Sequence, residues 1–473
     1  MSAFKQKLAR LGATAGVLAA STAAFMAVGG VTAGSALATP TCVTGGGNLG
    51  AQGSTLQREA QQLWTGREVP SAVGTPPYTK LTGGYAEKCA VAGDTTFSYA
   101  GTGSGAALNA FAMNGAALNK EFAYVGTDEA PTAAQITTAT NTTGVAPLVM
   151  PVAQTSIAVI ANIPSQCAIS GGLKYADLNK LFAGTITKWS QVSTVANKGN
   201  CETEEAAEET ASPGSAKITR VVRSDGSGTS YQFKNYLSEL ETTEGAVGPG
   251  SVNVGSGCVT RTWAQLRPNE TPATGAPNTS WPESACDAGV TAVSKQSGGG
   301  GVAGFVAANA NTIGYAALPD AEAKGAGLVS LQNEESVAHG PHYVSPVVGT
   351  HANCSERSYT VPSAGRDEGS NTGIGVDWST TFGANPEIGG SEFPLCTLTF
   401  DIAWNGYATA GYTSGATVGS AVHDYLANYV LSTASGEGQK TLNTHFYNEL
   451  PEAEGEAEND VLDAAKLTAS HIH

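Results

Sequence analysis

Residues 218–240 read ITRVVRSDGSGTSYQFKNYLSEL, and the character of this stretch changes twice. The β-branched residues 218–222 predict a strand, the Gly- and Ser-rich residues 223–230 predict a turn, and the remainder predicts a helix. A helix start leaves backbone N–H groups unpaired and carries a partial positive charge. Because glycine lets a ligand approach the backbone and Ser and Thr add hydroxyl donors, this turn is suited to an anion.

Two further segments share this order of strand, turn and helix. Gly53-Ser54-Thr55-Leu56 leads into an expected helix, and Gly101-Thr102-Gly103-Ser104-Gly105 lies between an expected strand and another helix. For any one of these turns, helix capping is the simpler explanation, because Ser and Thr are common N-cap residues. Three such turns in one chain, one of them carrying Arg223, instead favour a site for a tetrahedral oxyanion.

The sequence lacks the motifs of several competing binding and catalytic sites. It has no Gly-Lys-Ser/Thr of a P-loop, no third glycine of a dinucleotide-binding fingerprint in residues 101–106, and no Gly-x-Ser-x-Gly elbow. No histidine has an evident serine partner. We therefore expect binding without catalysis and without a cofactor.

Strand-like and helix-like segments alternate along the rest of the chain, which is typical of α/β layers. The strand-like segments are 97–99, 123–125, 155–160, 218–222 and 312–315. The helix-like segments are 55–64, 105–113, 175–182, 229–240, 302–309 and 417–431. In the last helix-like segment, apolar residues recur at every fourth position from Val418 to Val430, which predicts a buried stripe.

The composition allows a large folded core and restricts the partners. The 473 residues are 41% apolar and 14% charged, which excludes a disordered chain. A net charge of −16 argues against binding to nucleic acid or to an anionic membrane surface. Residues 200–215, 255–290 and 325–375 are interpreted as insertions, the first of them as a solvated acidic loop, and 452–473 as an acidic tail that is an exposed helix or disordered.

Residues 1–38 have the pattern of a cleaved export signal. Lys5, Lys7 and Arg10 precede an uncharged stretch rich in Ala, Gly and Val, which ends in Ala36-Leu37-Ala38. A membrane anchor is the alternative, but the stretch is too weakly apolar for a stable span. The residues before Cys42 do not fit a lipid-anchoring site. We therefore expect an extracytoplasmic protein whose signal is cleaved near Ala38 and which is not inserted in the membrane afterwards.

The cysteines predict disulfides. An even number in an exported chain favours pairing, although eight cysteines allow 105 connectivities. We predict pairing of sequence neighbours, 42–89, 167–201, 258–286 and 354–396. A zinc site using His339, His342, His351 and Cys354 is the alternative; the Gly, Pro and Ser around it and the disulfide role of Cys354 favour no metal.

These segments together resemble the phosphate-binding proteins of bacterial ABC importers, the PstS family. Arg223–Thr229 matches the family's Arg-x-Asp-Gly-Ser-Gly-Thr, and Gly126-Thr127-Asp128 is similar to its Gly-Ser-Asp. The turns at 53–55 and 99–106 also resemble family segments, although Leu56 and Gln57 stand where the family usually has Phe and Pro. Further matches in the family's order are 178–189, 313–315, 377–379 and 448–451.

The resemblance implies an α/β, two-lobed periplasmic-binding-protein fold with a ligand cleft between the lobes and a two-strand hinge. Lobe 1 would comprise residues 42–152 and 317–451, and lobe 2 residues 153–316. The implied function is high-affinity binding of inorganic phosphate, as a monomer, for delivery to an ABC permease. The alternatives are another oxyanion such as sulfate, a sensing or adhesive role, or a secreted phosphatase with Ser104 or Thr229 as nucleophile.

The resemblance also implies the site, residue by residue. Arg223 would supply the cation and Asp225 would hold it in place, while backbone and hydroxyl donors complete the cage. The implied phosphate-binding residues are Thr55, Leu56, Ser104, Asp128, Arg223, Asp225, Ser227, Gly228 and Thr229. For Arg223 the alternative is a surface ion pair with Asp225, which would otherwise be an ordinary turn residue.

Asp128 is unusual in an anion site because it is itself an acid. An ionised carboxylate only accepts hydrogen bonds, so it suits a ligand oxygen that still bears a proton. Phosphate offers that proton near neutral pH and sulfate does not, and a site of this kind can reject the wrong ligand by about 10⁴–10⁵-fold. The alternative is that Asp128 is the N-cap of a helix over residues 129–136.

Overall fold

The computed structural model describes most of the chain after the predicted export signal. The described residues are 42, 48–68, 79–80, 83–89, 96–243, 252–254, 259–263, 265–266, 279–282, 293–333, 342–354, 359, 361–362, 378, 392–452 and 461–473. The export signal and most of the predicted insertion 255–290 lie outside them. Within the described part, no helix combines the length and the apolar character that a membrane span requires.

One mixed sheet of eight strands organises the described chain, in the order β10-β7-β11-β6-β16-β5-β1-β4. Its strands are β1 (Asn48–Gly53), β4 (Thr96–Gly101), β5 (Phe122–Thr127), β6 (Pro147–Asn162), β7 (Thr219–Arg223), β10 (Val293–Gln296), β11 (Thr312–Ala317) and β16 (Cys396–Trp404). The five predicted strands are all present. β1 runs parallel to β4 and β5 at one end, and β7 runs parallel to β10 and β11 at the other.

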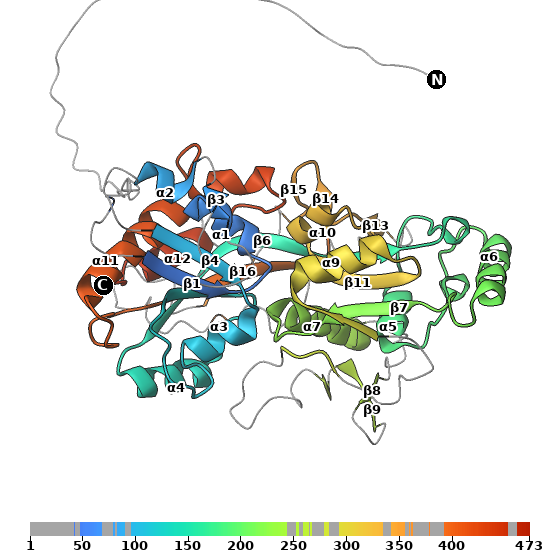
Figure 1. The fold of residues 1–473 in the computed structure, drawn as a ribbon, viewed down its shortest axis with the longest axis horizontal. Helices are drawn as coiled ribbons and strands as arrows, with labels where there is room; N and C mark the ends of the chain where they lie inside the picture. The colour runs from blue at the N-terminus through green and yellow to red at the C-terminus, as the bar shows by residue number, and fades with distance from the viewer. Residues whose placement is uncertain are drawn as a thin grey trace, which may run out of the picture. The chain divides into compact units, whose positions relative to one another are not determined.

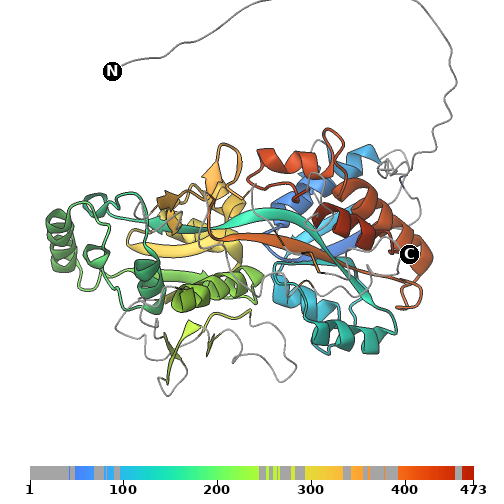
Figure 2. The same ribbon diagram turned by 180° about the vertical axis from the view of Figure 1, so that it is seen from behind.

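Two long antiparallel strands connect these parallel halves. The first part of β6, Pro147–Ser156, pairs with β16, and the second part, Ile157–Asn162, pairs with β11. β16 in turn pairs with β5. In Figures 1 and 2, the teal β6 and the orange-red β16 run from one half of the sheet to the other.

Helices follow the parallel strands, as expected of βα units. The helices are α1 (Arg58–Thr65), α2 (Gly84–Lys88), α3 (Ser104–Ala110), α4 (Ala133–Thr143), α5 (Tyr175–Ala183), α6 (Lys198–Ala211), α7 (Gly228–Thr243), α9 (Gly298–Ala308), α10 (Leu318–Lys324), α11 (Gly415–Tyr425) and α12 (Val461–Ala469). The short strands are β2 (Arg67–Glu68), β3 (Thr79–Lys80), β8 (Val252–Val254), β9 (Val259–Arg261), β12 (Leu331–Asn333), β13 (His342–Val344), β14 (Val347–Val348) and β15 (His351–Ala352). Each of the six predicted helical segments contains a helix.

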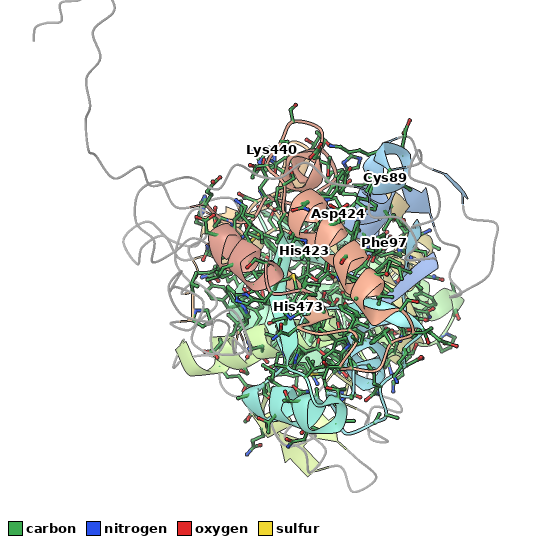
Figure 3. The ribbon with its side chains drawn as sticks, turned by 90° about the vertical axis from the view of Figure 1, so that its left-hand side faces the viewer. Cys89, Phe97, His423, Asp424, Lys440 and His473 are labelled. Atoms are coloured by element: carbon green, nitrogen blue, oxygen red, sulfur yellow. A yellow bond between two sulfur atoms is a disulfide. The ribbon has the colours of Figure 1, made fainter. Side chains whose placement is uncertain are left out.

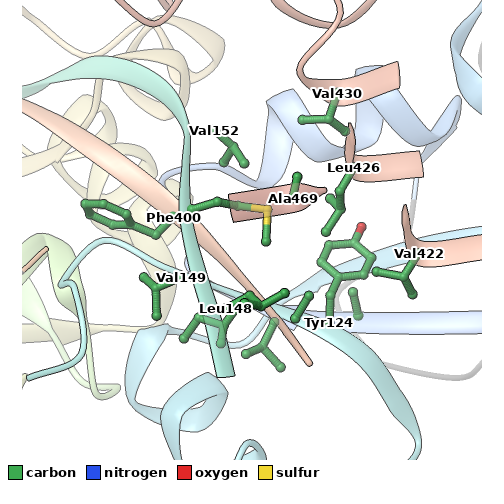
Figure 4. Close-up of a cluster of buried hydrophobic side chains, with 14 of the residues drawn as sticks. Tyr124, Leu148, Val149, Val152, Phe400, Val422, Leu426, Val430 and Ala469 are labelled. Atoms are coloured by element: carbon green, nitrogen blue, oxygen red, sulfur yellow. The ribbon is translucent and has the colours of Figure 1, made fainter. Parts of the chain in front are cut away.

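The buried apolar side chains form two separate clusters. One gathers around β1, β4 and β5 and includes Trp64, Phe97 and Tyr124, and the other gathers around β7 and β11 and includes Trp189 and Phe233. The predicted stripe from Val418 to Val430 is buried in the first cluster, where it continues from α11 into a π-helical turn, Leu426–Val430. Figure 4 shows part of this stripe with side chains of β5, β6, β16 and α12.

Two predictions about acidic segments are wrong. Residues 200–215 are not a loop, because α6 covers 198–211 and buries Glu205 and Cys201. Ala and Glu are good helix formers, and the Asn197 side chain accepts a hydrogen bond from the Asn200 N–H at the helix start, so the charged run is compatible with a helix. At the C-terminus, α12 is buried against β6 rather than exposed, since its apolar positions include Val461 and Ala465.

The structure confirms three of the predicted disulfides. Cys42 pairs with Cys89, Cys167 with Cys201, and Cys354 with Cys396, whereas Cys258 and Cys286 lie outside the described residues. The backbone N–H of Cys42 also donates to Asp424 of α11; Figure 3 labels Cys89 and Asp424 on this side of the chain. Because Cys354 is oxidised, it offers no thiolate to the alternative zinc site.

Candidate anion-binding site

The predicted Gly- and Ser-rich turns meet at the carboxyl ends of the parallel strands. Gly103 N donates to Gly53 O over 2.7 Å, which joins the turn after β4 to the turn after β1. Gly105 N donates to Gly226 O over 3.1 Å, which joins the turn after β4 to the turn after β7. Turns from both halves of the sheet are therefore in direct contact (Figure 1). Carboxyl ends of parallel strands are where α/β proteins place ligands.

Asp128, directly after β5, lies at the centre of this contact and is 1% exposed. Its Oδ1 accepts a hydrogen bond from the hydroxyl of Ser54 and lies 3.1 Å from the hydroxyl of Thr399, which has a closer acceptor in Gln57 Oε1 at 2.7 Å. Its Oδ2 accepts one from the hydroxyl of Thr229 on α7 at 3.0 Å. Burial raises the pKa of Asp128, and the three nearby hydroxyls together with Arg223 oppose that shift. Asp128 thus links strand ends from both halves of the sheet.

The helix-cap alternative for Asp128 is wrong. The next helix, α4, begins at Ala133, and its N-cap is Thr132, which forms a reciprocal capping box with Gln135. The backbone of Asp128 is bound elsewhere: its N–H donates to Ser104 Oγ over 3.2 Å, and its carbonyl accepts from the Gln232 side chain over 2.8 Å. These bonds fix the carboxylate between α3 and α7.

Arg223, the last residue of β7, is buried rather than part of a surface ion pair. It is 2% exposed, and it donates through Nε to Asp225 Oδ1 over 2.8 Å and through Nη2 to Asp225 Oδ2. Asp225 also accepts a hydrogen bond from Gly298 N at the start of α9. Nη1 of Arg223 has no hydrogen-bond partner among the described residues. The guanidinium is therefore held in place with one nitrogen left to donate.

The other predicted residues lie around these two. Thr55 Oγ1 accepts from Gly299 N at 3.3 Å, and Leu56 N donates to Ser54 Oγ at 2.9 Å. Ser227 Oγ accepts from the Ser230 N–H at 3.1 Å, which caps the first turn of α7. A Cβ built on Gly228 would lie 2.6 Å from Ser104 Oγ, so these two residues are in close contact.

Several residues at the candidate site were not predicted from the sequence. The run Gly298–Gly301 after β10 has the same strand, turn and helix order as the three predicted turns, so that pattern was available in the sequence. Thr399 lies inside β16, where nothing local distinguishes it from a structural strand residue. Ser54 belongs to a predicted turn, but only its spatial neighbour Asp128 reveals its role.

Glu129 is the most unusual of the missed residues. It is 0% exposed, and neither of its carboxylate oxygens has a hydrogen-bond partner among the described residues. A Cβ built on Gly228 would collide with Glu129 Oε2, which places this carboxyl group at the first turn of α7. Burial, with the like charge of Asp128, raises the pKa of Glu129 to about 8.

Comparison with known proteins agrees with this architecture. The sequence model of a family described as the PBP superfamily domain matches residues 65–360. A search of the curated proteins finds no match. Among solved structures, the chain is similar to PfluDING, described as a high-affinity periplasmic phosphate-binding protein bound with phosphate. The identity is 20%, the alignment covers 85% of this chain and 91% of that one, and the TM-score is 0.52.

Two other solved structures show the same likeness. One is a phosphate-binding protein from Stenotrophomonas maltophilia, with 19% identity, coverage of 89% of this chain and 93% of that one, and a TM-score of 0.52. The other is a human phosphate-binding apolipoprotein, with 18% identity, coverage of 85% and 91%, and a TM-score of 0.51. At these identities the likeness establishes the fold. The chain belongs to the PBP superfamily and has its two-lobed α/β fold.

Proposed function

We propose that this protein binds inorganic phosphate outside the cytoplasm, without catalysis, and delivers it to an ABC permease. The observation that carries the proposal is the convergence of Asp128 and Arg223, from opposite halves of the sheet, in one buried cluster of hydroxyls and helix starts. The cluster offers an unpartnered guanidinium nitrogen of Arg223 together with hydroxyl and backbone donors, which suits a small oxyanion. Local dipoles can decide binding because the charge of the whole protein is screened.

The hydrogen-bonding capacity that remains favours a protonated anion. An ionised carboxylate has about four acceptor sites, and the hydroxyls of Ser54 and Thr229 take two of those on Asp128. Thr399 lies 3.1 Å from Asp128, but its single proton has a closer acceptor in Gln57 Oε1 at 2.7 Å. Asp128 therefore has acceptor capacity left for a ligand proton, while Arg223 Nη1 is left to donate. Phosphate supplies both a proton and unprotonated oxygens, whereas sulfate supplies only the latter.

The contacts of the candidate nucleophiles favour binding over a phosphatase. Thr229 donates its hydroxyl proton to Asp128, and the Ser104 hydroxyl accepts from Asp128 N. Both hydroxyls thus orient the carboxylate that we assign to ligand recognition. The predicted export signal and the three disulfides support a location outside the cytoplasm, and we propose that a monomer closes its two lobes on phosphate.

Calorimetric titration of the purified protein with phosphate and with sulfate tests this function. We expect one phosphate per chain, and stabilisation by about 2.7 kcal/mol when phosphate is present at 100 times its dissociation constant. Sulfate at the same concentration should produce little stabilisation. Equal binding of both anions would favour the general oxyanion alternative, and binding of neither would overturn the proposal.

A further inference from the structure

The cluster that we assign to phosphate contains a third acid besides Asp128 and Asp225. Glu129 follows Asp128 directly, and its Oε2 lies against Gly228, where α7 begins. A Cβ placed on Gly228 would lie 2.6 Å from Ser104 Oγ and 2.8 Å from Asp128 Cβ. The carboxyl group of Glu129 is therefore among the residues of the proposed cage and not beside it.

The charges in this cluster do not balance if every acid is ionised. Asp225 already neutralises Arg223 through two hydrogen bonds. Asp128 and Glu129 would then leave two negative charges buried together, and a phosphate ion would add at least one more. Isolated buried charges are costly enough that the group takes up a proton instead. One of the two acids must therefore carry a proton when phosphate is bound.

The hydrogen bonds decide which acid carries it. The hydroxyls of Ser54 and Thr229 donate to Asp128 and stabilise its ionised form. Neither oxygen of Glu129 has a hydrogen-bond partner among the described residues, and the effect of burial on its pKa outweighs that of the nearby hydroxyls of Ser104 and Thr127. Hydrogen bonds donated to a carboxylate favour its charged form, and burial without them favours the neutral form. The shared proton accordingly resides on Glu129.

We propose that Glu129 is a specificity-determining residue whose protonated carboxyl group donates a hydrogen bond to the bound phosphate, so that phosphate binding requires this proton. The inference rests on the proposed function and deepens it. A neutral acid adds one donor next to the start of α7, whereas the ionised acid would repel the ligand. The two adjacent acids thus have opposite roles: Asp128 accepts the ligand's proton, and Glu129 donates its own.

The groups that face Glu129 allow its titration to be isolated. α3 contributes Ser104 and α7 contributes Gly228, neither of which is charged, and the turn of Glu129 itself contributes Asp128. The Arg223–Asp225 pair at the end of β7 acts on Asp128 through the Arg223 charge. Phosphate also titrates near neutral pH, so the comparison must be made with a variant that shares every one of these groups.

The test measures phosphate affinity from pH 6 to pH 9.5 in the full-length protein, in E129Q and in E121Q. The amide introduced in E129Q retains a donor but does not titrate, and Glu121 is an exposed acid just before β5 that serves as the matched control. If binding requires the proton, the phosphate dissociation constant of the wild type should rise between pH 7 and pH 9 about tenfold more than that of E129Q. The ratio of the two changes removes the titration of phosphate itself. E121Q should behave like the wild type.

A second measurement does not depend on the folding of a variant. Calorimetry of the wild type in buffers of different ionisation enthalpy should show proton uptake with phosphate above pH 8, beyond what the ligand's own titration requires. Equal pH profiles for the wild type and E129Q, or no additional proton uptake, would overturn the inference while phosphate binding stands. If neither protein binds phosphate at any pH, the proposed function fails, and the inference with it.

Discussion

Arg223 is the residue whose removal tests the site most directly, because it supplies the cation in the proposed cage. Substitution by alanine leaves the ligand's charge unmatched and strands Asp225, which Arg223 holds through two hydrogen bonds. We expect R223A to lose about 2–5 kcal/mol of phosphate binding free energy, measured by calorimetry. The control is K440A, which removes a cation from an ion pair with Glu449 that is far more exposed. An unchanged affinity of R223A would contradict the assignment.

Asp128 tests selectivity rather than affinity. In D128N the amide can donate to any unprotonated oxygen, so the penalty against sulfate disappears, while the hydroxyls of Ser54 and Thr399 still find an oxygen acceptor. The ratio of sulfate to phosphate dissociation constants should fall by at least about tenfold, which corresponds to about 1.4 kcal/mol. Competition titrations of the wild type and the variant measure this ratio, and equal ratios would contradict the role of the ligand proton.

At the residue scale, the turns that meet at the candidate site were predictable because a local pattern marks them. Arg223 and Asp225 stand in one turn, and their pairing follows from a separation of two residues. Thr399 and Glu129 carry no comparable signal, because their roles depend on neighbours distant in the sequence, such as Gly228. The sequence showed that Asp128 is followed by a second acid, but only the fold shows that both are buried together.

At the scale of elements, strands and helices were predictable wherever the apolar period was clear. The strand over residues 155–160 was recognised, but not that β6 extends back to Pro147, because pairing with β16 extends it. α6 was not predicted because it has many charged residues and few buried ones. The Cys167–Cys201 disulfide attaches it to the rest of the chain, and the Asn197 side chain caps its start. Tertiary contacts, rather than local propensity, decide both cases.

The start of α7 provides a prediction at the same scale. A methyl group at Gly228 would collide with Glu129 Oε2, Ser104 Oγ and Asp128 Cβ, so G228A should disturb the contact between α7 and the other turns. We expect it to cost about 1–3 kcal/mol of stability and to weaken phosphate binding. G304A is the matched control, since its methyl group inside α9 meets nothing closer than 3.9 Å and should stabilise by about 0.5–1 kcal/mol. Equal stability of the two variants, measured by urea unfolding, would rule out the collision.

At the scale of the whole molecule, the buried acids make stability depend on pH. The pKa of Glu129 rises from an ordinary 4.5 to about 8 on folding, mainly through burial, and that of Asp401 rises to about 7 for the same reason. Between the unfolded and folded values the native state holds protons that the unfolded chain has released. The free energy of unfolding should therefore fall as pH rises through this window, by up to about 1.4 kcal/mol per pH unit for each group, and level off above it.

E129Q separates the contribution of Glu129 from that of Asp401, because the variant keeps Asp401 and loses one titration. Below about pH 4.5 the two proteins should have similar pH slopes. Between that pH and about 8 the free energy of unfolding should fall less steeply for E129Q than for the wild type. The difference in free energy of unfolding, E129Q minus wild type, should therefore increase until the pH passes the folded-state pKa of Glu129. Urea unfolding without phosphate at pH 4 to pH 9 measures the difference, with E121Q expected to follow the wild type. Parallel curves for E129Q and the wild type would mean that folding does not change the pKa of Glu129, which would contradict the proton assigned to this buried acid.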